Sequence, residues 1–167
     1  MLYFKKTCVI IYIDSGTLWK KVGDFMLMGE FHHTIDEKNR IIIPSKFRNE
    51  LGKEFIITRG LEKCLFVYSM DEWNNIVSKL KTIPFTKKDS RNFTRFFMSG
   101  ATLCVLDKSG RACITSPLVH YAGLSRDCVI IGANDRLEIW DSNAWNEFFD
   151  NNEENFADIA ENLFGGE

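Results

Sequence analysis

Apolar stretches separated by turn-forming residues run along most of this chain. In each half, an apolar stretch leads to a polar turn, and a second apolar stretch follows the turn. Short stretches bounded by Gly, Pro, Asn, Asp or Ser are typical of strands and hairpins. We expect strands at 31–35, 40–43, 55–58 and 65–68 in the first half, and at 102–106, 111–114, 128–131 and 137–140 in the second.

Helix signals alternate with these strands. Pro44 and Ser116-Pro117 open two short helices, and Gly52 and Gly123 close them, because proline suits the first helical turn and glycine the position after the last. Two further helices are expected after Ser69 and Asp141, which are placed as N-caps four residues before Trp73 and Trp145. The residues Ser69 to Glu72 form a capping box.

A linking region joins the two halves. The stretch "TIPFTKKDS" reads as a polar connection, and "RNFTRFFM" as a short helix with three phenylalanines on one face. These are Phe93, Phe96 and Phe97. The pattern as a whole predicts a mixed α and β protein built from short strands and hairpins.

The two halves are copies of one another. The segment "DEKNRIIIPSKFRNELG" aligns without a gap with "DKSGRACITSPLVHYAG", so Gly52 meets Gly123. After one inserted residue in the second copy, "CLFVYSMDEW" aligns with "RLEIWDSNAW". A period of about 70 residues is too long for a solenoid repeat and indicates a duplicated small domain.

Each copy carries an Asp-x-x-x-Arg turn, at Asp36–Arg40 and Asp107–Arg111. The aspartate carboxylate can cap the turn, while Asn39 and Gly110 stand where a left-handed backbone is expected. Turn chemistry alone accounts for the Asp and for Asn or Gly. It accounts less well for the recurring arginine, which can offer a planar fork to phosphate or guanine.

Charge is unevenly distributed, although the formal net charge is only -2. From Asp135 to Glu167 there are ten acidic residues and one basic residue, and residues 1–134 carry a net charge of +7. A basic body can bind a polyanion through a local patch even when the whole chain is slightly acidic. A solvated helix end is the other reading of the acidic tail.

Residues 1–25 do not read as a signal peptide, because their apolar run is short and lacks a cleavage pattern. Val22-Gly23-Asp24-Phe25 precedes Met26, and codons for Gly-Asp can spell a ribosome-binding sequence. We therefore expect residues 1–25 to be a mis-annotated or disordered extension, with the native start at Met26 or Met28.

Cysteine and histidine usage argues against several classes of site. Five cysteines without a Cys-x-x-Cys spacing do not indicate a disulfide framework or a zinc ribbon, and fit thiols buried in a cytosolic protein. His32 and His33 are adjacent on an expected strand, so they point to opposite faces. No phosphate-binding loop, nucleophile elbow or metalloprotease motif occurs. We expect no enzyme activity, metal, cofactor or small-molecule substrate.

From Met28 to about Phe149 the sequence resembles the MraZ family, encoded at the head of the bacterial division and cell wall gene cluster. The resemblance rests on "MGEFHHTIDEKNRIIIPSKFR", "ITRGLEKCLFVY", "DEW", "RFFMSGA", "DKSGR", "YAGL" and "EIW". It implies an α+β, mainly β fold, in which two tandem AbrB-type (SpoVT-AbrB) swapped-hairpin modules form a double-split β-barrel pseudo-dimer with short flanking helices. One departure is Thr115 in place of Pro44, which leaves the start of the second short helix open.

The resemblance also implies a cytoplasmic, nucleoid-associated transcriptional regulator that binds double-stranded DNA. It would act as a ring of identical chains on repeats upstream of its own operon, without a membrane partner. The expected division of the chain is an extension (1–25), two SpoVT-AbrB-like modules (30–73 and 101–145) and an acidic C-terminal helix or tail (146–167).

The candidate DNA-binding residues are basic or polar residues of the two turns: Arg40 and Arg111 first, then Lys38, Asn39 and Lys108. Asp36, Asp107 and Gly110 are expected to shape the turns. Four other basic residues (Lys46, Arg48, Arg59 and Arg136) carry no sequence signal that directs them to DNA. The alternative is an AbrB-like antitoxin or protein-binding module that works through the acidic tail, with Phe149, Phe156, Ile159 and Leu163 as anchors.

Overall fold

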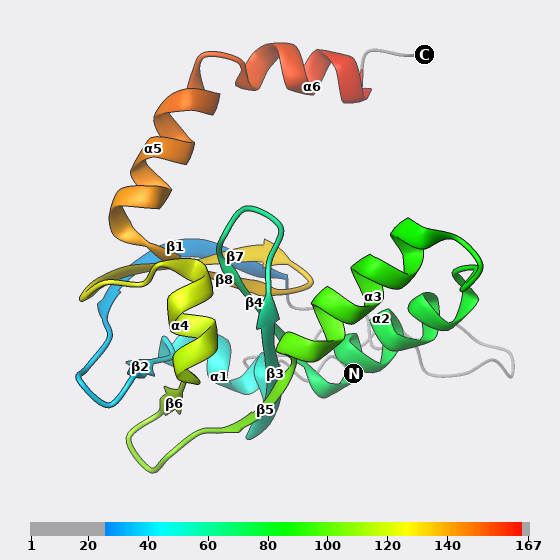
Figure 1. The fold of residues 1–167 in the computed structure, drawn as a ribbon. Coiled ribbons are helices and arrows are strands. Elements are labelled where there is room, and N and C mark those ends of the chain that lie inside the picture. Colours follow the sequence, from blue (N-terminus) through cyan, green and yellow to red (C-terminus); the bar gives the residue numbers. More distant parts are fainter. Residues whose placement is uncertain (1–25, 165–167) are drawn as a thin grey trace, which may run out of the picture.

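Two antiparallel sheets form the body of the protein in the computed structural model, which describes residues 26–164 (Figure 1). The large sheet has the strand order β1-β7-β8-β4-β3-β5, and the small sheet pairs β2 with β6. The strands are β1 (Leu27–Thr34), β2 (Arg40–Ile42), β3 (Glu54–Arg59), β4 (Leu65–Ser69), β5 (Thr102–Val105), β6 (Arg111–Cys113), β7 (Asp127–Asn134) and β8 (Leu137–Asp141).

Helices flank the two sheets, so the expected α+β class with antiparallel strands is confirmed. The helices are α1 (Ser45–Leu51), α2 (Met70–Thr82), α3 (Lys88–Gly100), α4 (Ser116–Ala122), α5 (Ser142–Glu153) and α6 (Phe156–Phe164). Among the described residues, no helix combines the length and apolar character needed to cross a membrane. The expectation for residues 1–25 lies outside the described part of the chain.

The two halves of the chain exchange strands. β1 of the first half pairs along its length with β7 of the second, and β5 of the second half pairs with β3 of the first. Equivalent residues of the repeat occupy equivalent places, since His33 lies opposite Cys128 and Cys104 lies opposite Phe55. The halves are therefore related by an approximate two-fold axis, on which β2 meets β6.

The expected hairpins form only at their turns, where the N–H groups of Asp36 and Asp107 donate to the carbonyls of Arg40 and Arg111. In the structure β2 pairs with β6, while the isolated bridge between Ile35 and Ile41 links β2 to the segment just before it. Pairing across the axis sets Ile41 directly opposite Ala112, and both are fully buried. A local hairpin would not bring these two side chains together, so burial favours the exchanged arrangement.

The short helices begin and end where their terminal residues predict. α1 follows Pro44 and ends before Gly52, whose φ is 77°. α4 begins at Ser116, the position equivalent to Ser45, and ends before Gly123 in the left-handed conformation. Thr115 therefore replaces Pro44 without moving the helix start, because the proline at 117 still lies in the first turn.

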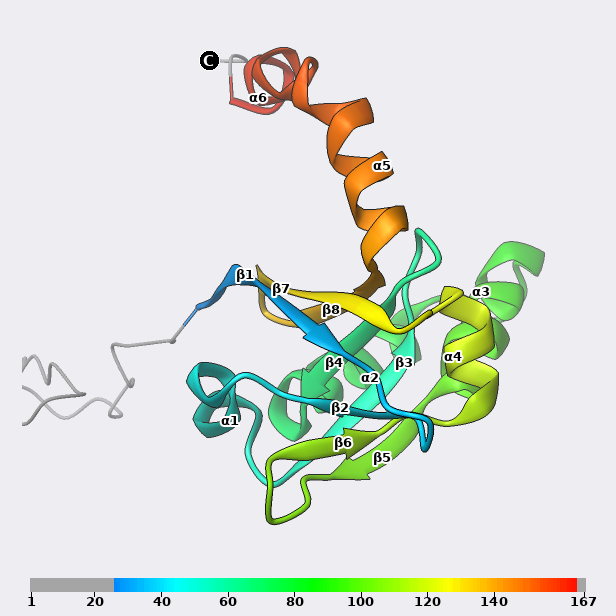
Figure 2. The ribbon, with the colours of Figure 1, turned by 90° about the vertical axis from the view of Figure 1, so that its left-hand side faces the viewer.

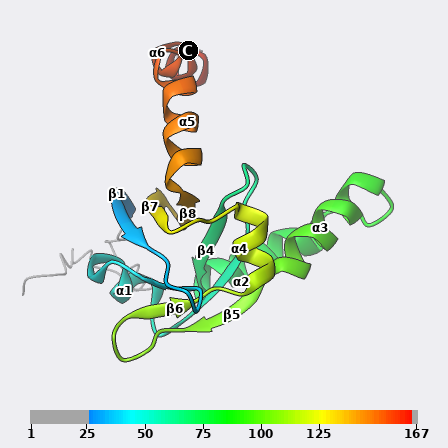
Figure 3. The same cartoon turned by 60° about the vertical axis from the view of Figure 1, so that its left-hand side comes forward.

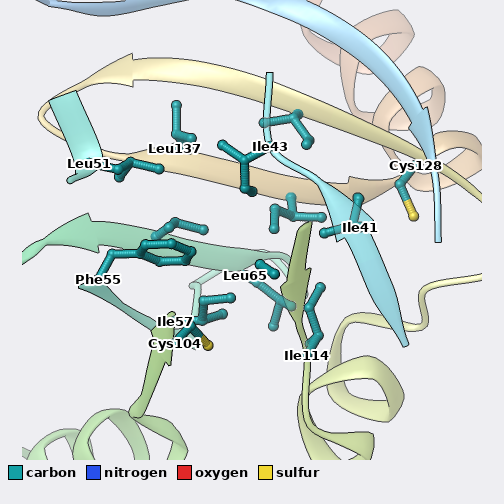
Figure 4. Packing of buried hydrophobic residues seen from close by; sticks show 14 of the residues in the cluster. Ile41, Ile43, Leu51, Phe55, Ile57, Leu65, Cys104, Ile114, Cys128 and Leu137 are labelled. Carbon is teal, nitrogen blue, oxygen red and sulfur yellow. The ribbon is translucent and has the colours of Figure 1, made fainter. Parts of the chain in front are cut away.

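The main core lies between the large sheet and the β2–β6 pair. Figure 4 shows Ile41, Ile43 and Ile114 directed toward Leu65, Phe55 and Leu137 of the large sheet. All six side chains are at most 1% exposed. Each contributes about 1.5–3 kcal/mol by leaving water, so the β2–β6 pair is held mainly by the apolar side chains on its inner face.

A second, aromatic cluster attaches α2 and α3 to another part of the large sheet. Trp73 of α2 stacks on Phe97 of α3 with ring centroids 5.6 Å apart, and Phe97 also contacts Tyr68 of β4. We call α2, α3 and the loop between them the helical hairpin (residues 70–100). It projects from the body to one side, as Figures 1 and 3 show.

The helical hairpin differs from the sequence expectation in two respects. Its second helix begins at Lys88, so part of the expected polar connection is helical. Phe93 and Phe97 stack on each other, but Phe96 turns to the ring of Tyr121 and is 48% exposed. Adjacent positions on a helix lie about 100° apart, so the three phenylalanines divide between two neighbours rather than sharing one face.

Both longer helices that follow a β-strand have the expected N-caps. The Ser69 hydroxyl accepts from the backbone N–H of Glu72 at 3.3 Å, and the Asp141 carboxylate accepts from that of Asn143 at 3.0 Å. The Glu72 carboxylate accepts from the Asn75 side chain rather than from the N–H of Ser69, so the cap forms without the reciprocal bond of the expected capping box. Trp145 packs on Trp140 at 5.5 Å and joins α5 to the sheet.

We call α5 and α6 the C-terminal arm (residues 142–164). Figure 2 shows it leaving the sheet at the end of β8 and extending away from the body. Three of its apolar side chains are more than 70% exposed: Phe156, Leu163 and Phe164. The arm is therefore attached through the start of α5, while its outer part contributes little to the core.

Candidate nucleic-acid interface

The first turn is organised by the carboxylate of Asp36. Its Oδ1 accepts from the backbone N–H groups of Lys38 and Arg40, each at 2.9 Å. Its Oδ2 accepts from Nε of Arg40 at 2.8 Å and lies 2.7 Å from Nη2 of the same side chain. Asn39 has a φ of 56°, which is the left-handed conformation expected for this position.

The second turn repeats this arrangement. Asp107 Oδ1 accepts from the backbone N–H groups of Ser109 at 2.8 Å and Arg111 at 3.0 Å, and Oδ2 accepts from Nε of Arg111 at 2.7 Å. Gly110 has a φ of 75°. The expected turn-shaping roles of Asp36, Asp107 and Gly110 thus have a direct structural counterpart in these hydrogen bonds.

Strand pairing brings the two arginines onto one surface. Arg40 lies opposite Cys113, and Arg111 lies opposite Ile42. Side chains alternate between the faces of a sheet, so these four residues share the outer face while Ile41 and Ala112 share the buried one. Residues in such diagonal positions are about 7–8 Å apart. We call β2, β6 and their turns (36–42 and 107–113) the arginine ribbon.

The two arginine side chains are about one-third exposed, at 32% for Arg40 and 33% for Arg111. Two further hydrogen bonds hold the ribbon: the N–H of Ile43 donates to the carbonyl of Gly110 at 3.0 Å, and that of Ile114 to the carbonyl of Asn39 at 2.8 Å. Each bond joins the turn of one half to the strand end of the other. The ribbon therefore holds both arginines at a fixed separation.

The aspartates remain charged at neutral pH. The Arg40 side chain, which donates to its carboxylate, lowers the pKa of Asp36 to about 2. Hydrogen bonds from the backbone N–H and then the side chain of Arg111 lower the pKa of Asp107. Each arginine is thus paired with a carboxylate, so the ribbon can offer directed N–H donors but only a weak positive field.

The charges next to the turns are mixed. Lys38 and Lys108, two of the candidate DNA-binding residues, are both exposed, and so is Glu37. The two lysines are not equivalent in the repeat, because Lys38 occupies the place of Ser109 and Lys108 that of Glu37. Across both turns there are four basic and three acidic side chains, a net charge of +1.

Asn39 is partly used within the protein. Its side-chain amide donates to the hydroxyl of Ser116 at 3.3 Å, so it joins the first turn to the start of α4 in the other half. This contact orients the amide along the ribbon. A DNA contact by Asn39 would have to share or replace that hydrogen bond.

Arg48 is a basic residue beside the site that sequence reasoning passed over. Its Nε donates to the carbonyl of Ile43 at 2.8 Å, and its guanidinium lies so close to Gly110 that a Cβ there would overlap it. In the repeat, Arg48 corresponds to Val119, and Gly110 to Asn39. The two positions at which the copies differ, 48 and 110, therefore lie against each other across the axis. The fact that the repeat differs at both positions was the sequence signal that could have pointed to Arg48.

Lys53 and Arg126 also adjoin the ribbon. The N–H of Leu106, just before the second turn, donates to the carbonyl of Lys53. In the same way, the N–H of Ile35, just before the first turn, donates to the carbonyl of Arg126. Both basic residues are exposed. Only the exchanged pairing of the strands reveals their position, since each belongs to the opposite half from the turn it adjoins.

Three other basic side chains make contacts within the protein. Arg59 donates to the carbonyl of Phe96 at 2.6 Å and lies over the rings of Phe96 and Tyr121. Arg136 pairs with Glu138, and Lys46 donates to the carbonyl of Met28. These contacts fit structural roles.

The described residues contain no cluster of three or more His, Cys, Asp or Glu side chains that could hold a metal ion. His32 is exposed and bonds Glu30 at 3.0 Å on the same strand. Of the described cysteines, Cys64, Cys104 and Cys128 are buried. Cys113 is exposed on the outer face of the arginine ribbon, contrary to the expectation that the thiols are core residues.

A protein-family model matches the chain twice in succession, at residues 26–96 and 97–166. The family is described as "MraZ protein, putative antitoxin-like". The boundary between the two matches falls inside α3, in the region that links the two halves. Together the matches cover every described residue, and each contains one of the two turns.

Proposed function

We propose that this chain, which belongs to the MraZ family, is a sequence-specific DNA-binding transcriptional regulator. In this proposal it acts on the division and cell wall gene cluster, as a ring of identical chains bound to repeats upstream of its own operon. It is cytoplasmic and nucleoid-associated, and it works without enzyme activity, cofactor, metal, membrane or small-molecule substrate.

The observation that carries the proposal is the arginine ribbon. Two turns that are 71 residues apart in the sequence present equivalent arginines on one exposed face. Each guanidinium is held at Nε by an aspartate, which limits its motion before any ligand arrives. A preorganised guanidinium can donate to phosphate oxygens or to O6 and N7 of guanine.

The proposal includes a finer description of the fold. We assign the exchanged pairings of β1 with β7 and of β5 with β3 to a swapped-hairpin, double-split β-barrel pseudo-dimer of two SpoVT-AbrB-like modules. The approximate two-fold relation of the halves supports this assignment. In it, Asp36 and Asp107 shape the turns, Arg40 and Arg111 make the main contacts, and Lys38, Asn39 and Lys108 add contacts to the backbone of DNA.

Weak charge on the ribbon gives assembly a mechanistic role. A net charge of +1 over the two turns predicts low affinity of a single chain for DNA. A ring that offers many ribbons to repeated sites raises the effective concentration of each further contact. High affinity then requires both the ribbon and the ring.

The test is a binding measurement with the full chain and the DNA upstream of its gene, compared with scrambled DNA over a salt series. A variant with Arg40→Ala and Arg111→Ala should lose at least tenfold in affinity and show a shallower dependence on salt. The matched control is Lys46→Gln with Lys63→Gln, which removes two exposed positive charges outside the ribbon and outside the helical hairpin. Equal binding by the arginine variant, at unchanged assembly mass, would contradict the proposal.

A second candidate function is an antitoxin or protein-binding module that works through the acidic C-terminal arm. The exposed Phe156, Leu163 and Phe164 favour it. Truncation after Asp150 separates the two functions. Loss of a co-purifying protein at unchanged assembly mass supports the antitoxin, whereas loss of the assembly assigns the arm to packing.

A further inference from the structure

The C-terminal arm carries an unpaired apolar stripe and a strong negative charge. Phe156, Ile159 and Leu163 follow the i, i+3, i+7 spacing of one helix face, and they are 75%, 44% and 72% exposed. Residues 142–164 contain six acidic side chains and no basic one, a net charge of -6. An apolar stripe of this kind is normally covered by another element.

The helical hairpin has complementary properties. Its outer part, residues 79–95, contains six basic side chains and one acidic side chain, a net charge of +5. The basic residues are Lys79, Lys81, Lys87, Lys88, Arg91 and Arg95. Phe85 at the tip is 80% exposed, and Phe93 and Phe96 are 40% and 48% exposed. The hairpin thus offers basic and aromatic side chains together.

These two surfaces lie apart within one chain. The arm and the hairpin extend from the body in different directions in all three ribbon views (Figures 1–3). The apolar side chains of the arm therefore remain exposed in the single chain. Association between chains can cover them, because opposite charges then meet around an apolar centre.

We propose that the arm of one copy binds the helical hairpin of the next copy. The phenylalanine and leucine side chains of α6 pack against Phe85 and its neighbours, and the acidic side chains face the lysines and arginines of the hairpin. The contact joins two different surfaces, so it continues from copy to copy and forms a ring wherever the rotation closes.

Charge complementarity favours a second copy over a nucleic acid as the occupant of the hairpin. Contacts to the phosphates of duplex DNA need basic side chains but leave an exposed Phe85 without a partner, because the bases are stacked inside the duplex. The acidic arm explains the basic and the aromatic side chains of the hairpin together. The inference specifies the assembly contact of the proposed ring. Its first readout is the mass of the assembly without DNA, so the inference can fail while the arginine ribbon still binds DNA.

The experiment reverses charge on each surface of the full chain. One variant carries Lys87→Glu and Lys88→Glu in the hairpin, and the other carries Glu153→Lys and Glu161→Lys in the arm. Acidic residues are favourable at the start of α3, and basic residues are favourable in the last turns of α5 and α6, which contain Glu153 and Glu161, so these changes preserve the helices. Circular dichroism verifies folding, and light scattering coupled to size exclusion gives the mass.

Each reversed variant should fall from a multimer to the 19.3 kDa of one chain. Mixing the two variants in equal amounts should restore the multimer, because the reversed arm then meets the reversed hairpin and the native arm meets the native hairpin. The matched control, Lys53→Glu with Arg126→Glu, reverses two exposed charges on the body and should leave the mass unchanged.

Three results would overturn the inference. The mass of the reversed variants could equal that of the wild type, or the mixture could stay monomeric. In the third case, the hairpin variant keeps its mass but loses DNA affinity, which would assign the basic hairpin to nucleic acid. A loss of mass restored by mixing would support the arm-to-hairpin contact and no other pairing of surfaces.

Discussion

The two Asp-x-x-x-Arg turns share their internal hydrogen bonds and differ in their surroundings. In both turns the aspartate accepts two backbone N–H groups and the Nε of its arginine. The first turn has Asn39 at its left-handed position, with its amide bonded to Ser116. The second has Gly110 there, against the guanidinium of Arg48.

This difference separates two influences on the same motif. Local turn chemistry requires an aspartate, a residue that tolerates positive φ, and the backbone N–H groups that the carboxylate accepts. The choice between asparagine and glycine depends on the other half, since α4 brings a serine to the first turn and α1 brings an arginine to the second. Neither the local turn chemistry nor the contacts from the other half require an arginine at the last position of the turn. The recurrence of Arg40 and Arg111 therefore agrees with a role outside the fold.

The largest expected effect on stability comes from the approximate two-fold axis between the halves, where Ile41 lies opposite Ala112. Ile41→Ala should lower the free energy of unfolding by about 2–5 kcal/mol through cavity formation. Ala112→Ile should lower it by about 1–3 kcal/mol through overpacking. The double variant, which exchanges large and small side chains, should lose clearly less than the sum in urea unfolding. Strict additivity would mean that the two side chains do not share one space.

A smaller effect distinguishes the left-handed positions of the two turns. Gly110→Ala should lower the free energy of unfolding by about 1–3 kcal/mol, because Ala strains the backbone and displaces Arg48. Asn39→Gly should change it by less than about 1 kcal/mol, since glycine tolerates the same φ. Thermal unfolding measures both. Adding Arg48→Ala to Gly110→Ala should recover part of the loss, and no recovery would exclude the overlap.

The two helix N-caps give a further comparison of the halves. Ser69→Ala removes a cap and should lower the free energy of unfolding by about 1 kcal/mol. Asp141→Ala should lower it by about 1 kcal/mol more, because Asp141 also accepts from the backbone and hydroxyl of Ser125. Asp141→Asn keeps a capping oxygen and serves as the control. Equal losses for Ser69 and Asp141 would show that the Ser125 contacts add nothing.

The smallest effect is a difference between the aspartate pKa values. Removal of the guanidinium by Arg40→Gln should raise the pKa of Asp36 from about 2 toward 3.8, because the Arg40 side chain is the main cause of its lowering. Arg111→Gln should raise the pKa of Asp107 less, because the backbone N–H is the larger cause there. Carboxyl-carbon NMR follows both titrations. A larger change at Asp107 would reverse the ranking.

The lowered pKa values of Asp36 and Asp107 also determine in which direction stability changes with pH. Each folded-state pKa lies below the unfolded one, so the contribution of these carboxylates to stability is present above about pH 4. It is lost as the pH falls through the folded-state pKa, which is about 2 for Asp36. The aspartate and arginine of each turn therefore stay paired at neutral pH.

Local features were predictable from the sequence because neighbouring residues determine them. The turn conformations at Asn39 and Gly110, the N-caps Ser69 and Asp141, and the helix ends at Gly52 and Gly123 follow from side-chain chemistry within a few residues. The repeat likewise located both turns and both arginines.

The pairing of strands from one half with strands from the other could not be predicted from local sequence signals. A turn sequence specifies how the chain reverses, but not whether the strands beyond it pair with each other or with the other half. Arg48 was set aside and Lys53 and Arg126 were missed for this reason, because each adjoins a turn that belongs to the opposite half. The projection of the arm was missed too, since an amphipathic stripe reads the same whether it packs on its own chain or on another.

The pairing of β1 with β7 has a consequence for synthesis on the ribosome. Leu27 pairs with Asn134, so the first strand of the sheet emerges long before its partner. At about 5–20 residues per second, the delay is roughly 5 to 20 seconds. During that time the edge of β1 is open to strands of other nascent chains. Aggregation through the unpaired β1 is therefore favoured most where several ribosomes translate the same message close together.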